Sequence, residues 1–111
     1  MSYARFGYNS DVYVYEAFDA HYIVHVGRNR KDCDFSPPVY KGDFPSWFEG
    51  YQDFLERYSV LPYYAINCPK DGQPLSADSA EECIALLKEL QELGYRVPDH
   101  AFKSLEVSGM P

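Results

Sequence analysis

Several signals that would place this chain of 111 residues in a familiar class are missing from it. No apolar run approaches the ~20 residues that a membrane-spanning helix requires. The opening residues, MSYARFGYNSD, lack the charged and apolar regions of a secretory signal peptide. These absences predict a cytoplasmic protein without a membrane span.

Cysteine is scarce, and its spacing argues against both disulfides and metal. Cys33, Cys68 and Cys83 are isolated and odd in number, which is typical of reduced thiols. A structural zinc site requires paired ligands at short spacing, and the chain has no C-x-x-C. His21 and His25 share a predicted strand face but lie about 13 Å apart, too far to chelate one ion. We therefore expect no metal and no cofactor.

Catalytic motifs are absent as well. The chain has no G-x-S-x-G, no phosphate-binding glycine loop and no H-E-x-x-H. Cys33 is the only cysteine with basic neighbours, which favour a thiolate, but Asp32 and Asp34 flank it and oppose one. The sequence assigns no catalytic residue, and we expect a protein that is not an enzyme.

Basic residues are few: ten Lys and Arg stand against 17 Asp and Glu, for a formal charge of −7. A general nucleic-acid or anionic-membrane binder needs a positive field, so the balance disfavours both classes. It suits a protein that docks on a basic partner. Arg28, Arg30 and Lys31, in a predicted charged loop, keep a nucleic-acid-binding alternative open.

What the chain does have is an alternating pattern over residues 11–18 and 21–26. Valines fall on one face of each segment: Val12, Val14, Val24 and Val26. Period-two alternation of β-branched and aromatic residues predicts two strands, here folded back through a turn at Asp19-Ala20. We expect the valine face to meet the core, beneath the helices.

The opposite face of this hairpin carries an unusual set of rings: Tyr13, Tyr15, His21 and His25. Eleven tyrosines make this residue type the outlier of the composition. A helix or loop that half covers this face would explain the rings structurally, since aromatics favour strands. A partner-binding surface would explain them functionally. Both interpretations stay open.

A first helix is predicted over residues 45–58. Its aromatic residues recur at helical spacing and form one stripe, which we interpret as core: Trp47, Tyr51, Phe54 and Tyr58. Ser46 and Glu49 have the spacing of a capping box. Gly50 costs about 1 kcal/mol in a helix interior, which indicates close packing at that position.

A second helix is predicted over residues 80–93, with Ser79 and Glu82 as its capping box and Gly94 as its C-terminal stop. Its buried stripe comprises Ala80, Cys83, Ile84, Leu87 and Leu90. Its acidic face is a second candidate partner-binding surface: Glu81, Glu82, Glu89 and Glu92. A short last helix is expected over residues 100–107, capped by Asp99.

The remaining segments complete a single domain over residues 1–111. Residues 62–68 are expected to form a third strand, and residues 69–74 a turn or exposed loop. The fold class is therefore α+β: a small antiparallel sheet of about three strands, with the hairpin at its centre and the two main helices packed on one face.

Two stretches also carry a family resemblance. The opening M-S-Y-A-R-F-G with S-D-V-Y-V-Y-E, and the closing L-L-K-E-L-Q-E-L-G-Y-R-V-P, resemble small uncharacterised proteins of bacteriophages, particularly those of actinobacteria. The two stretches cover roughly a third of the chain. Those relatives tend to carry a cysteine cluster after the second strand, where this chain has residues 25–31, and residues 34–73 look like an insertion. The resemblance implies no activity.

Together these features predict a phage-encoded accessory protein that binds a host protein in the host cytoplasm. An inhibitor of a bacterial defence system, of the anti-CRISPR type, is one form of this hypothesis. The partner would contact the ring face of the hairpin or the acidic face of the second helix. A nucleic-acid-associated factor, a small enzyme and a structural protein are the alternatives.

Overall fold

The computed structural model describes residues 2–18 and 21–109, so the predicted turn at Asp19-Ala20 lies outside the described residues. The fold is α+β, as predicted, with two antiparallel sheets and three helices in the described part of the chain. The strands are β1 (Ser2–Ala4), β2 (Val12–Glu16), β3 (Tyr22–Val26), β4 (Asn29–Lys31), β5 (Tyr63–Ala65) and β6 (Pro74–Ala77). The helices are α1 (Phe44–Ser59), α2 (Ala80–Glu92) and α3 (Asp99–Ser108).

The main sheet has the order β1-β2-β3-β6, and the predicted hairpin is its centre. Val12 pairs with Val26, and Val14 pairs with Val24, so the four valines share one face. All four are buried, as the alternation predicted. The period-two pattern therefore identified both the strands and the face that meets the core.

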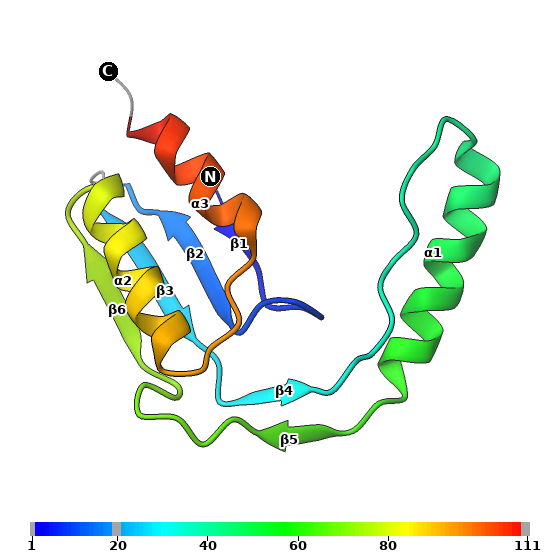
Figure 1. The fold of residues 1–111 in the computed structure, drawn as a ribbon, viewed down its shortest axis with the longest axis horizontal. Coiled ribbons are helices and arrows are strands. Elements are labelled where there is room, and N and C mark those ends of the chain that lie inside the picture. Colours follow the sequence, from blue (N-terminus) through cyan, green and yellow to red (C-terminus); the bar gives the residue numbers. More distant parts are fainter. Residues whose placement is uncertain (1, 19–20, 110–111) are drawn as a thin grey trace.

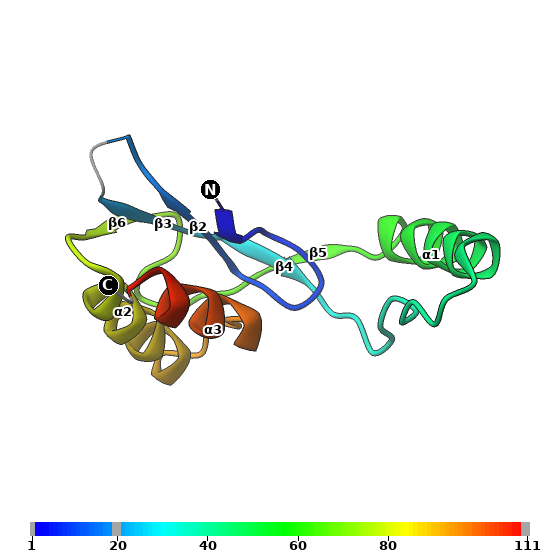
Figure 2. The same ribbon diagram turned by 90° about the horizontal axis from the view of Figure 1, so that it is seen from above.

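Two helices cover this valine face, but they are not the pair that the sequence predicted. Figure 2 shows α2 and α3 side by side on one face of the sheet. Leu87 and Leu90 of α2 and Ala101 and Leu105 of α3 are almost completely buried in the same core. The prediction that the helix of residues 45–58 roofs the sheet is wrong, since α3 takes that place.

The sheet also has more strands than expected. β6 pairs with β3 along one edge, through residues that we had assigned in part to a turn or loop. β4 falls in the predicted charged loop and pairs with β5 in a separate two-stranded sheet. Both omissions have one cause, because Pro74-Leu75-Ser76-Ala77 and Asn29-Arg30-Lys31 lack the β-branched alternation that marks a strand.

The two-stranded sheet leads away from the main sheet and carries α1 at its end (Figure 1). We call residues 29–65 the arm and the other described residues the body. Within the arm only Lys31 and Phe54 are buried. The Cα radius of gyration of 15.5 Å exceeds the about 13 Å expected for a compact chain of this length, which reflects the projecting arm.

The aromatic stripe of α1 packs mainly against the arm's own connecting segment, residues 32–43. The Trp47 indole Nε1–H donates to the Pro38 carbonyl (3.1 Å), and the Phe54 ring meets that of Phe35 edge-on. A Cβ on Gly50 would lie 3.3 Å from Pro38 Cγ, so the predicted close packing at this glycine is confirmed. The stripe is thus a local core of the arm outside the domain core, and it touches the body where the Phe54 ring meets that of Tyr8 edge-on.

The helix ends agree with the sequence at α2 but differ at the other two helices. Ser79 caps α2, Glu82 Oε2 accepts from the Asp78 N–H, and Gly94 ends the helix with a φ of 108°. In α1 the cap is Asp43, which accepts from the Ser46 N–H and Oγ–H, instead of the predicted Ser46–Glu49 box. In α3 the N-cap is Pro98, and Asp99 is the first helical residue.

Among the described residues, no helix combines the length and the apolar composition needed to cross a bilayer.

Candidate functional site

The uncovered face of the main sheet gathers three of the four predicted rings. Tyr13 lies opposite His25 in the register of β2 and β3. The Tyr15 hydroxyl and His25 Nε2 are 3.3 Å apart, with their rings stacked at 5.7 Å, and Tyr13 meets Tyr15 edge-on at 5.5 Å. These side chains are half-buried, chiefly by each other. Neither α2 nor α3 covers this face (Figure 2).

His21, the fourth predicted ring residue, lies at the opposite end of β3 from His25. Its Nε2 is 3.0 Å from Asp78 Oδ1, in the connection between β6 and α2, and forms an ion pair when the imidazole is protonated. The site that the sequence predicted as one set therefore divides into a ring cluster at Tyr13, Tyr15 and His25, and a separate His21–Asp78 contact.

The acidic face of α2 points away from the sheet. Glu81, Glu82, Glu89 and Glu92 are all exposed, while Cys83, Leu87 and Leu90 on the other side of the helix are buried. Glu82 is engaged in the N-terminal cap, whereas the carboxylates of Glu81, Glu89 and Glu92 have no hydrogen bond or ion pair among the described residues. This face presents several negative charges along one helix, as the sequence predicted.

The three cations of the nucleic-acid alternative do not form a shared surface. Arg28 is exposed, but Arg30 Nη2 lies 3.1 Å from Asp11 Oδ2 and donates to the Gly94 carbonyl (3.0 Å). Lys31 is only 5% exposed. Two of the three charges are therefore committed to contacts inside the fold, where a phosphate chain has little access to them.

Asp11 is a buried carboxylate that the sequence did not single out as structural. Its Oδ2 accepts from the Arg96 N–H (2.7 Å), its Oδ1 lies 3.3 Å from Arg96 Nη2, and Arg30 pairs with Oδ2. Arg96 also donates to the carbonyls of Tyr8 and Lys31. This cluster joins the first strand of the hairpin, the segment after α2 and the base of the arm.

Lys31 fixes the C-terminal end of the arm's helix. Its Nζ donates to the carbonyls of Tyr58 (3.0 Å) and Ser59 (3.3 Å), which lie in the last turn of α1. The same ammonium lies 4.7 Å from the ring centroids of Tyr58 and Tyr63. A cation at a helix C-terminus is favourable both to the free carbonyls and to the helix dipole. Lys31 thus holds α1 in a defined direction relative to β4 and β5.

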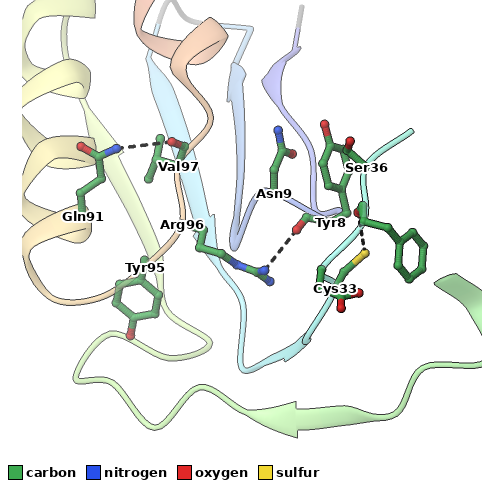
Figure 3. Close-up of a pocket in the computed structure, with 10 residues that line it drawn as sticks. Tyr8, Asn9, Cys33, Ser36, Gln91, Tyr95, Arg96 and Val97 are labelled. Atoms are coloured by element: carbon green, nitrogen blue, oxygen red, sulfur yellow. Dashed lines mark hydrogen bonds between the residues drawn. The ribbon is translucent and has the colours of Figure 1, made fainter. Parts of the chain in front are cut away.

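A hollow with a volume of about 680 Å³ lies between the body and the root of the arm (Figure 3). Three of its polar lining groups bond to other parts of the chain. The Cys33 thiol donates to the Phe35 carbonyl (2.9 Å), Arg96 donates to Tyr8 and Asp11, and Gln91 donates to Val97. The bond of the Cys33 thiol is thus to a backbone oxygen.

Four described groups have raised pKa values, namely Tyr3, Tyr58, Cys83 and Tyr95, and burial is the main cause in each; the shifts of Cys83 and Tyr95 are the large ones. Burial raises the pKa of the Cys83 thiol to about 11, so this cysteine stays protonated in the core, where the sequence predicted it. Burial and the hydrogen bond to Asp71 raise the pKa of Tyr95 to about 12. Its hydroxyl donates to Asp71 Oδ1 (2.7 Å) and accepts from the Lys70 N–H (2.8 Å). Both groups serve packing and loop position.

Most of the large apolar side chains that are exposed belong to the arm, and the sequence did not predict this surface. Of the eleven large hydrophobic residues that are exposed in the described structure, eight lie within residues 29–65: Val39, Tyr40, Phe44, Phe48, Leu55, Val60, Tyr63 and Tyr64. Phe44, Phe48 and Leu55 follow i, i+4 and i+11 spacing, so they form one ridge along α1, beside the stripe that the connecting segment covers. The helical periodicity of α1 indicates a wide apolar face, but it does not show which half of that face the rest of the chain leaves uncovered.

Within residues 2–18 and 21–109, no three His, Cys, Asp or Glu side chains gather closely enough to hold a metal ion. Comparison with protein-family models, with curated proteins and with solved structures gives no match to this chain.

Proposed function

We propose that the chain is a phage-encoded accessory protein that binds a basic surface of a host protein in the host cytoplasm, through the outer face of α2. The observation that carries the proposal is the set of exposed, structurally uncommitted carboxylates at Glu81, Glu89 and Glu92. Long-range attraction between such a face and a basic patch speeds association and orients the partner. The overall charge of −7 supports the same partner chemistry.

The ring face is the weaker of the two predicted surfaces for this role. Tyr13, Tyr15 and His25 are half-buried and contact one another, whereas the α2 carboxylates are free to meet a partner. The setting of phage and host rests on the sequence resemblance. Inhibition of a host defence system is the form of host binding that we propose for that setting.

Charge reversal tests the surface. Glu81→Lys, Glu89→Lys and Glu92→Lys together change the formal charge by +6, from −7 to −1. The matched control reverses three exposed carboxylates of the arm with the same total change: Asp32→Lys, Asp34→Lys and Asp53→Lys. Each protein is immobilised and exposed to lysate of an actinobacterial host, and any retained protein is purified and titrated against all three.

The proposal expects one host protein to bind the wild type and the control alike, and to bind the α2 variant at least about 30-fold more weakly. Its association rate should fall as salt rises, since exposed charges are screened within about 10 Å at 0.1 M salt. Equal binding by the two reversed variants would place the partner elsewhere and refute the role of α2.

The defence-inhibitor form has a separate test. Expression of the chain in a host with CRISPR immunity should restore plating of a targeted phage, and the α2 variant should fail to restore it. Full immunity in the presence of the wild-type chain would refute this form.

A further inference from the structure

The chain exposes more surface than a compact monomer of its mass. Its accessible surface is 7333 Å², whereas a compact monomer of 12.8 kDa has about 6,300 Å². The excess of about 1,000 Å² is close to the about 800 Å² that each partner contributes to a protein–protein interface of standard size. The arm is where the chain departs from a compact shape (Figure 1).

The composition of this surface favours a permanent partner. The ridge of Phe44, Phe48 and Leu55 is 44–56% exposed, and Val60 and Tyr63 near its C-terminal end are more exposed still. Contiguous apolar surface on one element marks an interaction site. Homodimer interfaces are more apolar than those between proteins that also exist apart. The ridge therefore has the chemistry of a contact between copies of one chain.

The same chain carries a second apolar surface that lacks a covering helix, the open face of the main sheet. Cross-strand partners share a face, so the register places six strand residues there: Tyr13, Tyr15, Ile23, His25, Pro74 and Ser76. Phe6, 53% exposed, extends the face beside Tyr13. None of these residues is a carboxylate, in a chain whose formal charge is −7.

The ridge and the open face are held apart within one chain. Lys31 fixes the C-terminal end of α1 to β4, and Arg30 fixes β4 to Asp11 of the body. Figures 1 and 2 both show α1 beyond the end of the main sheet, and not over either of its faces. A chain so built can cover both surfaces only by using another molecule.

We propose that two copies of the chain form a dimer in which the α1 ridge of each copy packs on the open sheet face of the other. A twofold axis satisfies both contacts at once and leaves neither of these two surfaces open to a third copy. A helix of 16 residues is about 24 Å long, enough to cross four strands spaced about 4.8 Å apart. Helices would then cover both faces of the sheet.

Charge supports the choice of this face over the helical side of the body. Glu49 and Glu56 lie on one side of the ridge, where the edge of the contact would bring them toward the six strand residues of the open face, none of them a carboxylate. On the other side of the body they would meet Glu81, Glu89 and Glu92, with repulsion. The dimer leaves α2 exposed. An experiment that disproves the dimer therefore leaves the proposed host binding untouched, and the reverse also holds.

Sedimentation velocity over a concentration series tests the proposal with one variant for each surface. The ridge variant is Phe48→Glu with Leu55→Glu, and the face variant is Tyr13→Glu. The control is Val107→Glu, which adds one negative charge, as the face variant does, at an apolar residue of α3 that is 69% exposed. Wild type and control should sediment at twice 12.8 kDa at micromolar concentration, and each surface variant should dimerise at least about 30-fold more weakly.

A mixture of the two variants separates this arrangement from other dimers. The intact ridge of the face variant can pack on the intact face of the ridge variant, so mixing should restore a heterodimer. If the ridge variant loses its far-UV circular dichroism, Phe48→Ser, which adds no charge, carries the same expectation. A monomeric wild type at 100 μM (about 100-fold above the expected range), a face variant that still dimerises, or a mixture that stays monomeric would each overturn the proposal.

Discussion

The body and the arm contain similar proportions of apolar residues but use them differently. In the body, the four valines of β2 and β3 meet Leu87 and Leu90 of α2 within a single core. In the arm, eight large apolar residues are exposed and the aromatic stripe of α1 packs on its own connecting segment. A core needs two layers that face each other. The arm supplies one layer and leaves the other to be provided by another molecule.

Truncation of a buried apolar side chain should give the largest difference in stability between the two regions. Leu87→Ala should lower the free energy of unfolding of the whole chain by about 3–5 kcal/mol, because Leu87 is completely buried in the body core. Phe54→Ala should loosen α1 while the body unfolds at nearly the same denaturant concentration. The fluorescence emission of Trp47, the only tryptophan, measures unfolding of the arm. Near-UV and far-UV circular dichroism measure unfolding of the body.

Equal shifts of both signals in both variants would contradict the distinction. In that case the arm and the body would unfold as one cooperative unit.

The alternating hairpin and α2 were the parts of the fold that the sequence determined most fully. In the hairpin the four valines face the core at a period of two, and in α2 the buried residues recur at the helical period, with capping residues close in sequence. The period of α1 was equally clear, and its predicted range differs from the observed one by a single residue at each end. Amphipathicity shows that a face must be covered, but not which segment covers it, and here Pro38 and Phe35 do so.

The candidate site was predictable to a similar extent. Tyr13, Tyr15 and His25 share a face because side chains alternate between the two faces of a sheet. The α2 carboxylates share a face because their spacing follows the helical period. The sequence around Asp11 gives no sign of its ion pairs, because its partner Arg96 is 85 residues away along the chain. The burial of Lys31 was hidden for the same reason, because its acceptors lie 27 and 28 residues along the chain.

Asp11 joins the two regions, and its removal should destabilise both. Asp11→Ala leaves Arg30 and Arg96 without their carboxylate, at a cost of about 3 kcal/mol in global stability. Asp11→Asn keeps an acceptor for the Arg96 N–H and should cost less. Chemical denaturation of the three proteins measures the order. A change below about 0.5 kcal/mol for the alanine variant would show that the cluster contributes little.

Lys31 should matter to the arm and not to the body. Lys31→Met removes the donor to the last carbonyls of α1 and the cation between two tyrosine rings, and should destabilise the helix by about 1.5 kcal/mol. The Trp47 emission transition should move, while the transition of the body stays in place. Arg28→Met, at an exposed cation two strand positions from Arg30, is the control and should leave both unchanged.

Tyr95 gives the smallest effect, and one that appears only at high pH. Burial raises its pKa from 10 to about 12. The neutral hydroxyl therefore contributes its full share to the folding stability below pH 10, and this contribution is lost as the pH rises through 12. Above pH 10 the wild type should therefore lose stability more steeply than Tyr95→Phe, which has no proton to lose. Parallel pH profiles for the two proteins would show that the hydrogen bond to Asp71 does not hold this proton.

Amide hydrogen exchange followed at low and high protein concentration tests the central claim most directly. At concentrations where the chain is monomeric, α1 should exchange much faster than α2, since only α2 lies in the core. At concentrations where it dimerises, exchange in α1 and in the uncovered strands should slow, while α2 keeps its rate. Equal protection of α1 and α2 at every concentration would contradict the account, because the arm would then be as fully packed as the body within a single chain.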